Sequence, residues 1–140
     1  MKKNLFVLVA AFMFLLASCG SKPTLSQWVE SDEVAAVEEE INAAYADAGL
    51  GLSVKFSADG EDVLVFSCIY EEYQILAGSN QSEIDAAFAD ELNSLGMSTN
   101  MSSIFEECEE ATGITLKCIR VQCVNVDGTV MYSQDYVNTK

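Results

Sequence analysis

The sequence predicts an α+β domain in which a four-stranded, mostly antiparallel sheet carries helices packed on one of its faces. Apolar residues recur at three- and four-residue steps in two acidic segments, which is the period of an amphipathic helix. Each segment is followed by alternating apolar and polar residues around an Asp-Gly pair, the pattern of a β-hairpin. The order helix, hairpin, helix, hairpin favours two packed layers around one core.

The first helix is expected to begin at a side-chain cap, provided by Ser26 or by Ser31. Gly49 and Gly51 follow its last apolar residue and end it. The acidic run over 38–40 falls on the opposite face. The apolar face is formed by Val34, Val37, Ile41, Ala44 and Tyr45.

Strands are predicted over 52–56 and 63–70, and two registers fit the turn between them. A two-residue loop places Phe56 beside Val63. A three-residue loop with a left-handed Gly60 places Val54 beside Leu64, and this register is preferred because it gathers the apolar side chains of both strands on one face. Those side chains are Leu52, Val54, Phe56, Leu64, Phe66, Cys68 and Tyr70.

The second unit repeats this order. Ser82 is a candidate helix cap, Gly96 breaks or kinks the helical region, and Gly113 ends it. A strand is predicted over 114–126, with a two-residue turn at Asp127-Gly128 and a return strand over 130–137. That turn pairs Ile119 with Tyr136, Cys123 with Tyr132 and, on the polar face, Arg120 with Asp135 as an ion pair. The sequence of residues 51–55 also resembles that of residues 113–117, which indicates either a duplicated unit or a pattern that any two helix–hairpin units share.

The first residues form a secretory signal, with a basic start and twelve uncharged, mostly large apolar residues over 5–16. The sequence Leu16-Ala17-Ser18-Cys19 resembles the bacterial lipobox, in which the Cys thiol receives diacylglycerol and the chain is cut before it. Three parts are therefore expected: a signal peptide over 1–18, a lipidated Cys19 with a short tether over 19–24, and one α+β domain over 25–140. The predicted location is the outer face of the cell membrane, or the outer membrane in a Gram-negative host.

Two segments resemble a family of small lipoproteins from Gram-positive, largely gut-dwelling bacteria that is classed as a domain of unknown function. They are Trp28-Val29-Glu30-Ser31-Asp32-Glu33-Val34 and the hairpin Val126-Asp127-Gly128-Thr129-Val130-Met131-Tyr132. The chain departs from the family in its Cys content and in Trp28, where Tyr is usual. The resemblance implies a fold and a membrane address, and it carries no catalytic residues.

Composition excludes several classes of function. The chain has no His, which excludes Ser-His and Cys-His catalysis and imidazole metal ligands. Loss of residues 1–18 would leave five basic residues against 22 acidic ones, a formal charge of −17. Such a charge disfavours nucleic acid as a partner. No loop has the alternating Asp and Asn residues of a dedicated Ca²⁺ site, so no metal and no cofactor are expected.

Four Cys remain after Cys19, and an even number in an exported chain permits disulfides. The strand pattern places Cys68 and Cys123 on the core face, with Cys108 on the inner face of a helix and Cys118 on the opposite face of the sheet. All four are expected to be small buried reduced thiols; if one bond forms instead, it would join Cys68 to Cys108 or Cys108 to Cys123.

The function predicted from these observations is a membrane-anchored interaction module without a catalytic role. Its partner would be an envelope protein, a peptide or a glycan, and the candidate contact residues are Trp28, Tyr70, Tyr73 and Arg120. The alternatives are an envelope enzyme acting through carboxylates or Cys, and a purely structural lipoprotein. An apolar open face of the sheet would favour binding, whereas a polar one would favour a solvated wall.

Overall fold

A computed structural model gives the structure and describes residues 22–74, 80–94 and 96–139. The order of helix, hairpin, helix, hairpin is confirmed, with each helical region divided in two. The elements are α2 (Leu25–Val29), α3 (Asp32–Asp47), β1 (Leu52–Asp59), β2 (Val63–Tyr70), α4 (Gln81–Ser94), α5 (Met97–Thr112), β3 (Cys118–Val124) and β4 (Val130–Val137). None of the helices in the described ranges is long and apolar enough to cross a membrane.

The four strands form one sheet in the order β1-β2-β3-β4. The two hairpins are antiparallel, but β2 and β3 run parallel, so the sheet is mixed and the expectation of a mostly antiparallel sheet is corrected. The physical reason is the helical connection between β2 and β3. The chain leaves β2 at one end and passes through α4 and α5 before it enters β3 at the other, as a parallel neighbour requires.

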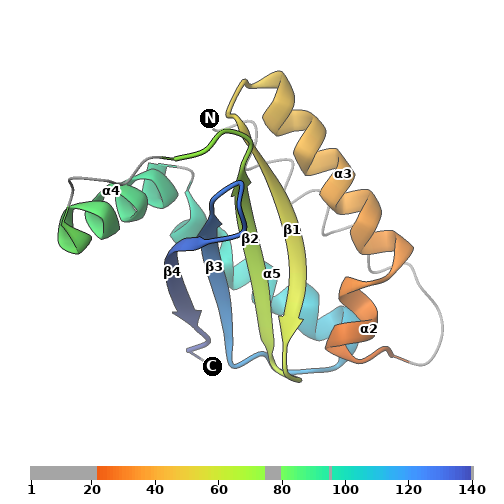
Figure 1. Ribbon diagram of the computed structural model, residues 1–140. Helices are drawn as coiled ribbons and strands as arrows, with labels where there is room; N and C mark the ends of the chain where they lie inside the picture. The colour runs from red at the N-terminus through yellow and green to blue at the C-terminus, as the bar shows by residue number, and fades with distance from the viewer. Residues whose placement is uncertain (1–21, 75–79, 95, 140) are drawn as a thin grey trace.

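One core joins the helices to a single face of the sheet. Figure 1 shows α5 crossing behind the strands, α3 running beside β1, and α4 extending past β4. The helices bury their apolar stripes, as the sequence predicts, and Ile41 and Cys108 have no exposed surface. The strands contribute alternate residues to the same core, among them Phe56 and Phe66, whose rings meet edge to face at 5.1 Å.

The first hairpin has the expected face but neither expected register. Gly60 is left-handed, with φ of 72°, as the three-residue loop requires. However, Val54 lies opposite Cys68 and Phe56 opposite Phe66, because Asp59 still pairs with Val63. The even-numbered residues of both strands nevertheless face the core, as predicted. The observed register and the preferred predicted register differ by an even number of residues, so the same side chains stay on the same face.

The second hairpin keeps its predicted pairs although its turn differs. Ile119 lies opposite Tyr136 and Cys123 opposite Tyr132. The Gly128 N–H donates to the Asn125 carbonyl, so the loop is longer than the two-residue turn that the Asp-Gly pair predicts. A register shift beside Cys123 absorbs the extra residue, and the remaining pairs are unchanged.

The helix caps differ in part from those predicted. The Thr24 hydroxyl caps α2 by accepting from the Gln27 N–H, so Ser26 is not the cap. Ser31 caps α3, as expected. Asn80, not Ser82, accepts from the third residue of α4, Glu83, because the helix already begins at Gln81.

The two similar segments of the sequence do not occupy equivalent places. Residues 52–55 lie in the edge strand β1, whereas residues 114–117 precede β3, a strand inside the sheet. In addition, β3 runs antiparallel to β1. The two units are therefore not related by a symmetry of the sheet, and a duplication of the sequence stays a prediction.

Candidate binding site at the open edge of the sheet

The two edges of the sheet differ in how their backbone groups are satisfied. Along β1, the outward N–H and C=O of Val54 bond to the Asn42 side chain at 2.6 and 3.2 Å. The Phe56 N–H donates to the Glu38 carboxylate at 2.7 Å. Both partners lie on α3, so the helix closes this edge against another strand.

The other edge, β4, presents open backbone groups. The Asn138 N–H donates to the Lys117 carbonyl, which fixes the residues of β4 that bond to β3 as the even-numbered ones. The N–H and C=O of Ser133, Asp135 and Val137 therefore point outward. Within the described part of the chain, no hydrogen bond reaches these outward groups. A strand that ends in this way is a template for another strand.

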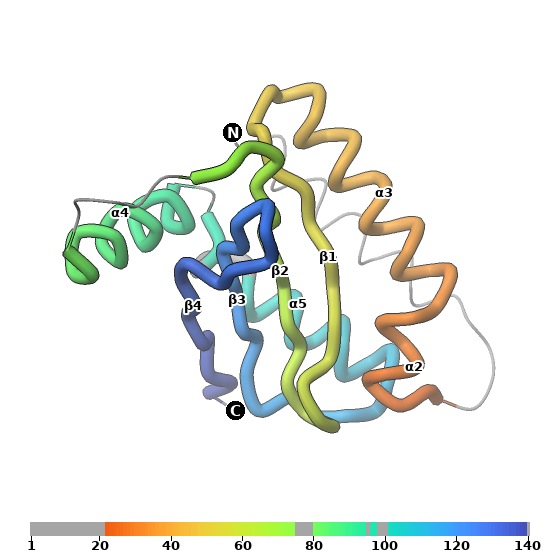
Figure 2. The backbone as a smooth tube through the Cα atoms, in the orientation of Figure 1, coloured from red at the N-terminus to blue at the C-terminus, as the bar shows by residue number. Residues whose placement is uncertain are grey.

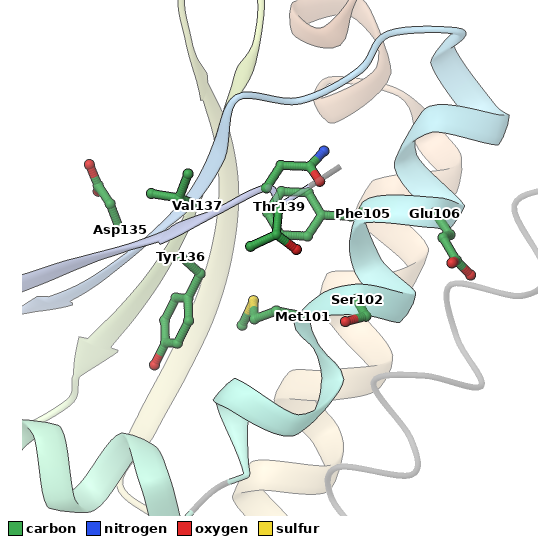
Figure 3. Close-up of a pocket in the computed structure, with 9 residues that line it drawn as sticks. Met101, Ser102, Phe105, Glu106, Asp135, Tyr136, Val137 and Thr139 are labelled. Carbon is green, nitrogen blue, oxygen red and sulfur yellow. The ribbon is translucent and has the colours of Figure 1, made fainter.

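A cleft of about 450 Å³ lies beside the end of this edge. One wall comes from α5 and the other from residues 135–139 (Figure 3). Met101 and Phe105 point from α5 toward the strand, whereas the carboxylates of Glu106 and Asp135 point away from the cleft on either side. The cleft therefore has a mixed lining, with Met101 and Phe105 at its inner side, polar groups from Ser102, Asn138 and Thr139, and carboxylates at its rim.

Tyr136 forms part of the cleft and is half-buried. Its hydroxyl oxygen has no hydrogen-bond partner within the described chain, and burial raises the pKa of this phenol. A buried hydroxyl without a partner is costly, so the ring is held here by packing and not by its polar end.

Aromatic side chains pack α4 onto the sheet near the other end of β4. Phe88 stacks on Tyr132 at 5.9 Å and meets Tyr70 edge to face at 6.1 Å. The Tyr70 hydroxyl donates to the Glu91 carboxylate at 2.8 Å, and burial raises its pKa. These contacts cover the inner face there, whereas the inner face beside residues 135–139 opens into the cleft.

The loops at one end of the sheet are tied together by Asn125, which is 4% exposed. Its side chain accepts from the N–H groups of Gln74 and Val126 and donates to the Gln74 carbonyl, at 2.9 to 3.0 Å. Figure 2 shows the turn between β3 and β4 beside the segment that leaves β2. The hairpin that carries the open edge is therefore anchored to the first half of the chain.

The open face of the sheet is mainly polar. Arg120 bonds to Asp135 at 2.8 Å, as predicted, and also reaches Asp59 at 2.7 Å, across the intervening strand β2. The guanidinium lowers the pKa of the Asp135 carboxyl. A small second apolar cluster of Val63, Val65 and Cys118 lies on this same face, beside Arg120. The arrangement matches the solvated wall, so the edge, and not the face, is the better candidate for contact.

The candidate contact residues are not brought together. Trp28 is 3% exposed and packs in the core, and Tyr70 is turned toward α4. Tyr73 is 60% exposed and follows β2, while Arg120 is engaged by its two carboxylates. Sequence reasoning missed the outward backbone groups of β4, because alternation predicts a strand without saying whether it lies at an edge.

The four described Cys are free and buried. The register places Cys68 directly beside Cys123, and burial raises the pKa of the Cys108 and Cys123 thiols to about 12. The predicted pairings through Cys108 stay predictions. Cys19 and the signal lie outside the described residues. Within those ranges, no cluster of three acidic or Cys side chains has the arrangement of a metal site.

A family model described as Domain of unknown function (DUF4854) matches residues 25–136. The chain belongs to this family. The DUF4854 match agrees with the family class expected from the sequence, and it spans both helix–hairpin units. It also includes most of the open edge and the α5 wall of the cleft. No curated protein and no solved structure shows significant similarity to the chain.

Proposed function

We propose that this DUF4854 protein is a lipid-anchored binding module of the bacterial envelope that captures an extended, basic peptide segment by strand addition to β4. The observation that carries the proposal is the difference between the edges. Side chains of α3 bond to β1, whereas the outward groups of Ser133, Asp135 and Val137 are open to a partner. Main-chain hydrogen bonds along such an edge supply affinity for an extended segment.

The charge of the chain favours a basic occupant. The full sequence carries a formal charge of −15. A second copy on the same edge would bring two such charges together, and the repulsion opposes a dimer through β4. A basic segment is instead attracted, and salt should weaken the attraction.

The membrane address rests on the first 22 residues. Two acyl chains on Cys19 would give stable anchoring, and a tether of a few residues would keep the domain near the membrane. Incorporation of labelled palmitate that is lost in Cys19→Ala would support this address. Release of the unchanged chain into the medium would contradict it.

Strand addition is tested with the full chain purified from membranes in detergent and a fluorescent peptide of sequence KVTFTVK. We expect saturable binding by fluorescence anisotropy, weakened by salt, and slower hydrogen exchange in residues 130–137. Two further peptides carry N-methyl groups on alternate amides, one on each edge of the peptide. One methylated set should abolish binding and the other should preserve it, because a strand pairs through one edge only. Absence of binding, or equal binding by both methylated peptides, would refute strand addition.

A proline variant tests the edge on the protein side. Ser133→Pro removes an outward N–H without removing a bond to β3, which an edge strand tolerates. Ala58→Pro makes the matched change at an outward position of β1. We expect Ser133→Pro to weaken binding of KVTFTVK and Ala58→Pro to leave it unchanged. If Ala58→Pro weakened binding and Ser133→Pro did not, the peptide would bind at β1 and not at β4.

A further inference from the structure

We infer that the cleft between α5 and the end of β4 is a side-chain pocket of this edge, and that it selects a large apolar residue of the added segment. This inference rests on the proposed strand addition and adds to it the chemistry of the residue that is recognised.

The cleft continues the edge on the side of the sheet that carries the helices. Tyr136 lies opposite Ile119, a core residue, so its side chain is on the helix-covered face. The cleft walls from α5 lie on that same side (Figure 3). An added strand would therefore have open solvent on one face and, beside Tyr136, the cleft on the other.

Side chains of neighbouring strands that lie directly opposite share a face. The residue of the added segment beside Tyr136 would therefore point toward α5 and into the cleft. Its neighbours in the segment would point to the open face, near the Arg120 and Asp135 ion pair. Every second residue of the segment would face the helices, but only the one beside Tyr136 reaches the cleft, which fixes the register of the segment.

The inner side of the cleft favours an apolar side chain, although the lining also includes polar groups of Ser102, Asn138 and Thr139. Met101 and Phe105 form the inner side and are 4% and 7% exposed, while the carboxylates of Glu106 and Asp135 point away from the interior. Val137, at the end of β4, is 66% exposed and would be partly covered by the segment. The volume of about 450 Å³ accommodates an aromatic or large aliphatic side chain.

The test compares KVTFTVK with KVTATVK on the full chain in detergent. Burial of the phenyl ring predicts that the Ala peptide binds about 10- to 100-fold more weakly. Ser102→Trp fills the cleft from an exposed position of α5, and Ser94→Trp makes the same change on the exposed surface of α4, outside the cleft. Ser102→Trp should reduce the affinity of KVTFTVK to that of KVTATVK and leave KVTATVK unchanged. Ser94→Trp should leave both affinities unchanged.

The outcomes separate the pocket from the strand addition. Equal affinities for the two peptides, with residues 130–137 still protected and N-methylation still effective, would overturn the pocket and keep the strand addition. An equal loss of both peptides in Ser102→Trp would also overturn the pocket, because it would show a blocked edge without side-chain selection. Failure of both peptides to bind the unaltered chain would overturn the proposed function, and the pocket with it.

Discussion

Removal of the Asn42 amide is expected to reopen the edge of the sheet that α3 closes. Asn42→Ala deletes two hydrogen bonds to Val54, at 2.6 and 3.2 Å, and leaves both backbone groups of that residue without their partner. Each bond contributes about 1 kcal/mol net, so the two contribute about 2 kcal/mol. Ala is a better helix former than Asn by about 0.6 kcal/mol, which offsets part of the loss. The free energy of unfolding should therefore fall by about 1.5 kcal/mol.

Urea unfolding of the full chain in detergent measures this change, and hydrogen exchange locates it. The midpoint should fall with an unchanged slope, and the Val54 amide should exchange faster. Asn42→Asp keeps the acceptor for the Val54 N–H, so its unfolding midpoint should lie between those of the unaltered chain and Asn42→Ala. Glu39→Ala, at an exposed position of the same helix, is the matched control and should change little. An Asn42→Ala variant with unaltered stability and an equally protected Val54 amide would refute the closure of β1 by α3.

Three further predictions follow from the contacts. Asn125→Ala removes three hydrogen bonds at a site 4% exposed and should lower the free energy of unfolding by about 2–3 kcal/mol; a loss below about 0.5 kcal/mol in denaturant titrations would contradict the anchoring of the hairpin. Arg120→Met should raise the pKa of Asp135 toward its ordinary value, measured by NMR titration. Because the folded pKa of Asp135 is lowered, the contribution of this carboxylate to stability is complete above about pH 5 and is lost as pH falls through the folded pKa. If the stability of Arg120→Met depended on acid pH in the same way as that of the unaltered chain, this coupling would be contradicted. The Cys108 and Cys123 thiols, with pKa values near 12 and little or no exposure, should react with iodoacetamide at pH 8 only after denaturation, and rapid labelling of the native chain would show that these thiols are accessible.

Local patterns were sufficient for most of the fold because they depend on neighbours in the chain. The three- and four-residue spacing in α3 and the alternation in both hairpins identify which side chains face the core, and the structure confirms them at Ile41, Phe56 and Cys123. The Arg120 and Asp135 pair was also predictable, since both residues belong to one hairpin. Register in the first hairpin was not, because several even-numbered shifts bury the same residues.

The amino-acid sequence by itself determined the kinds of elements, their order, the absence of His and the acidic charge, and from these it excluded whole classes of catalysis. Only the tertiary structure decided that β2 and β3 run parallel, that Arg120 reaches Asp59, and that one edge is closed while the other is open. These features join residues that are far apart in the chain, and no local period encodes which strand lies at an edge. The candidate site belongs to this second group, because it consists of backbone groups that any residue carries and that become available only when β4 is the last strand of the sheet.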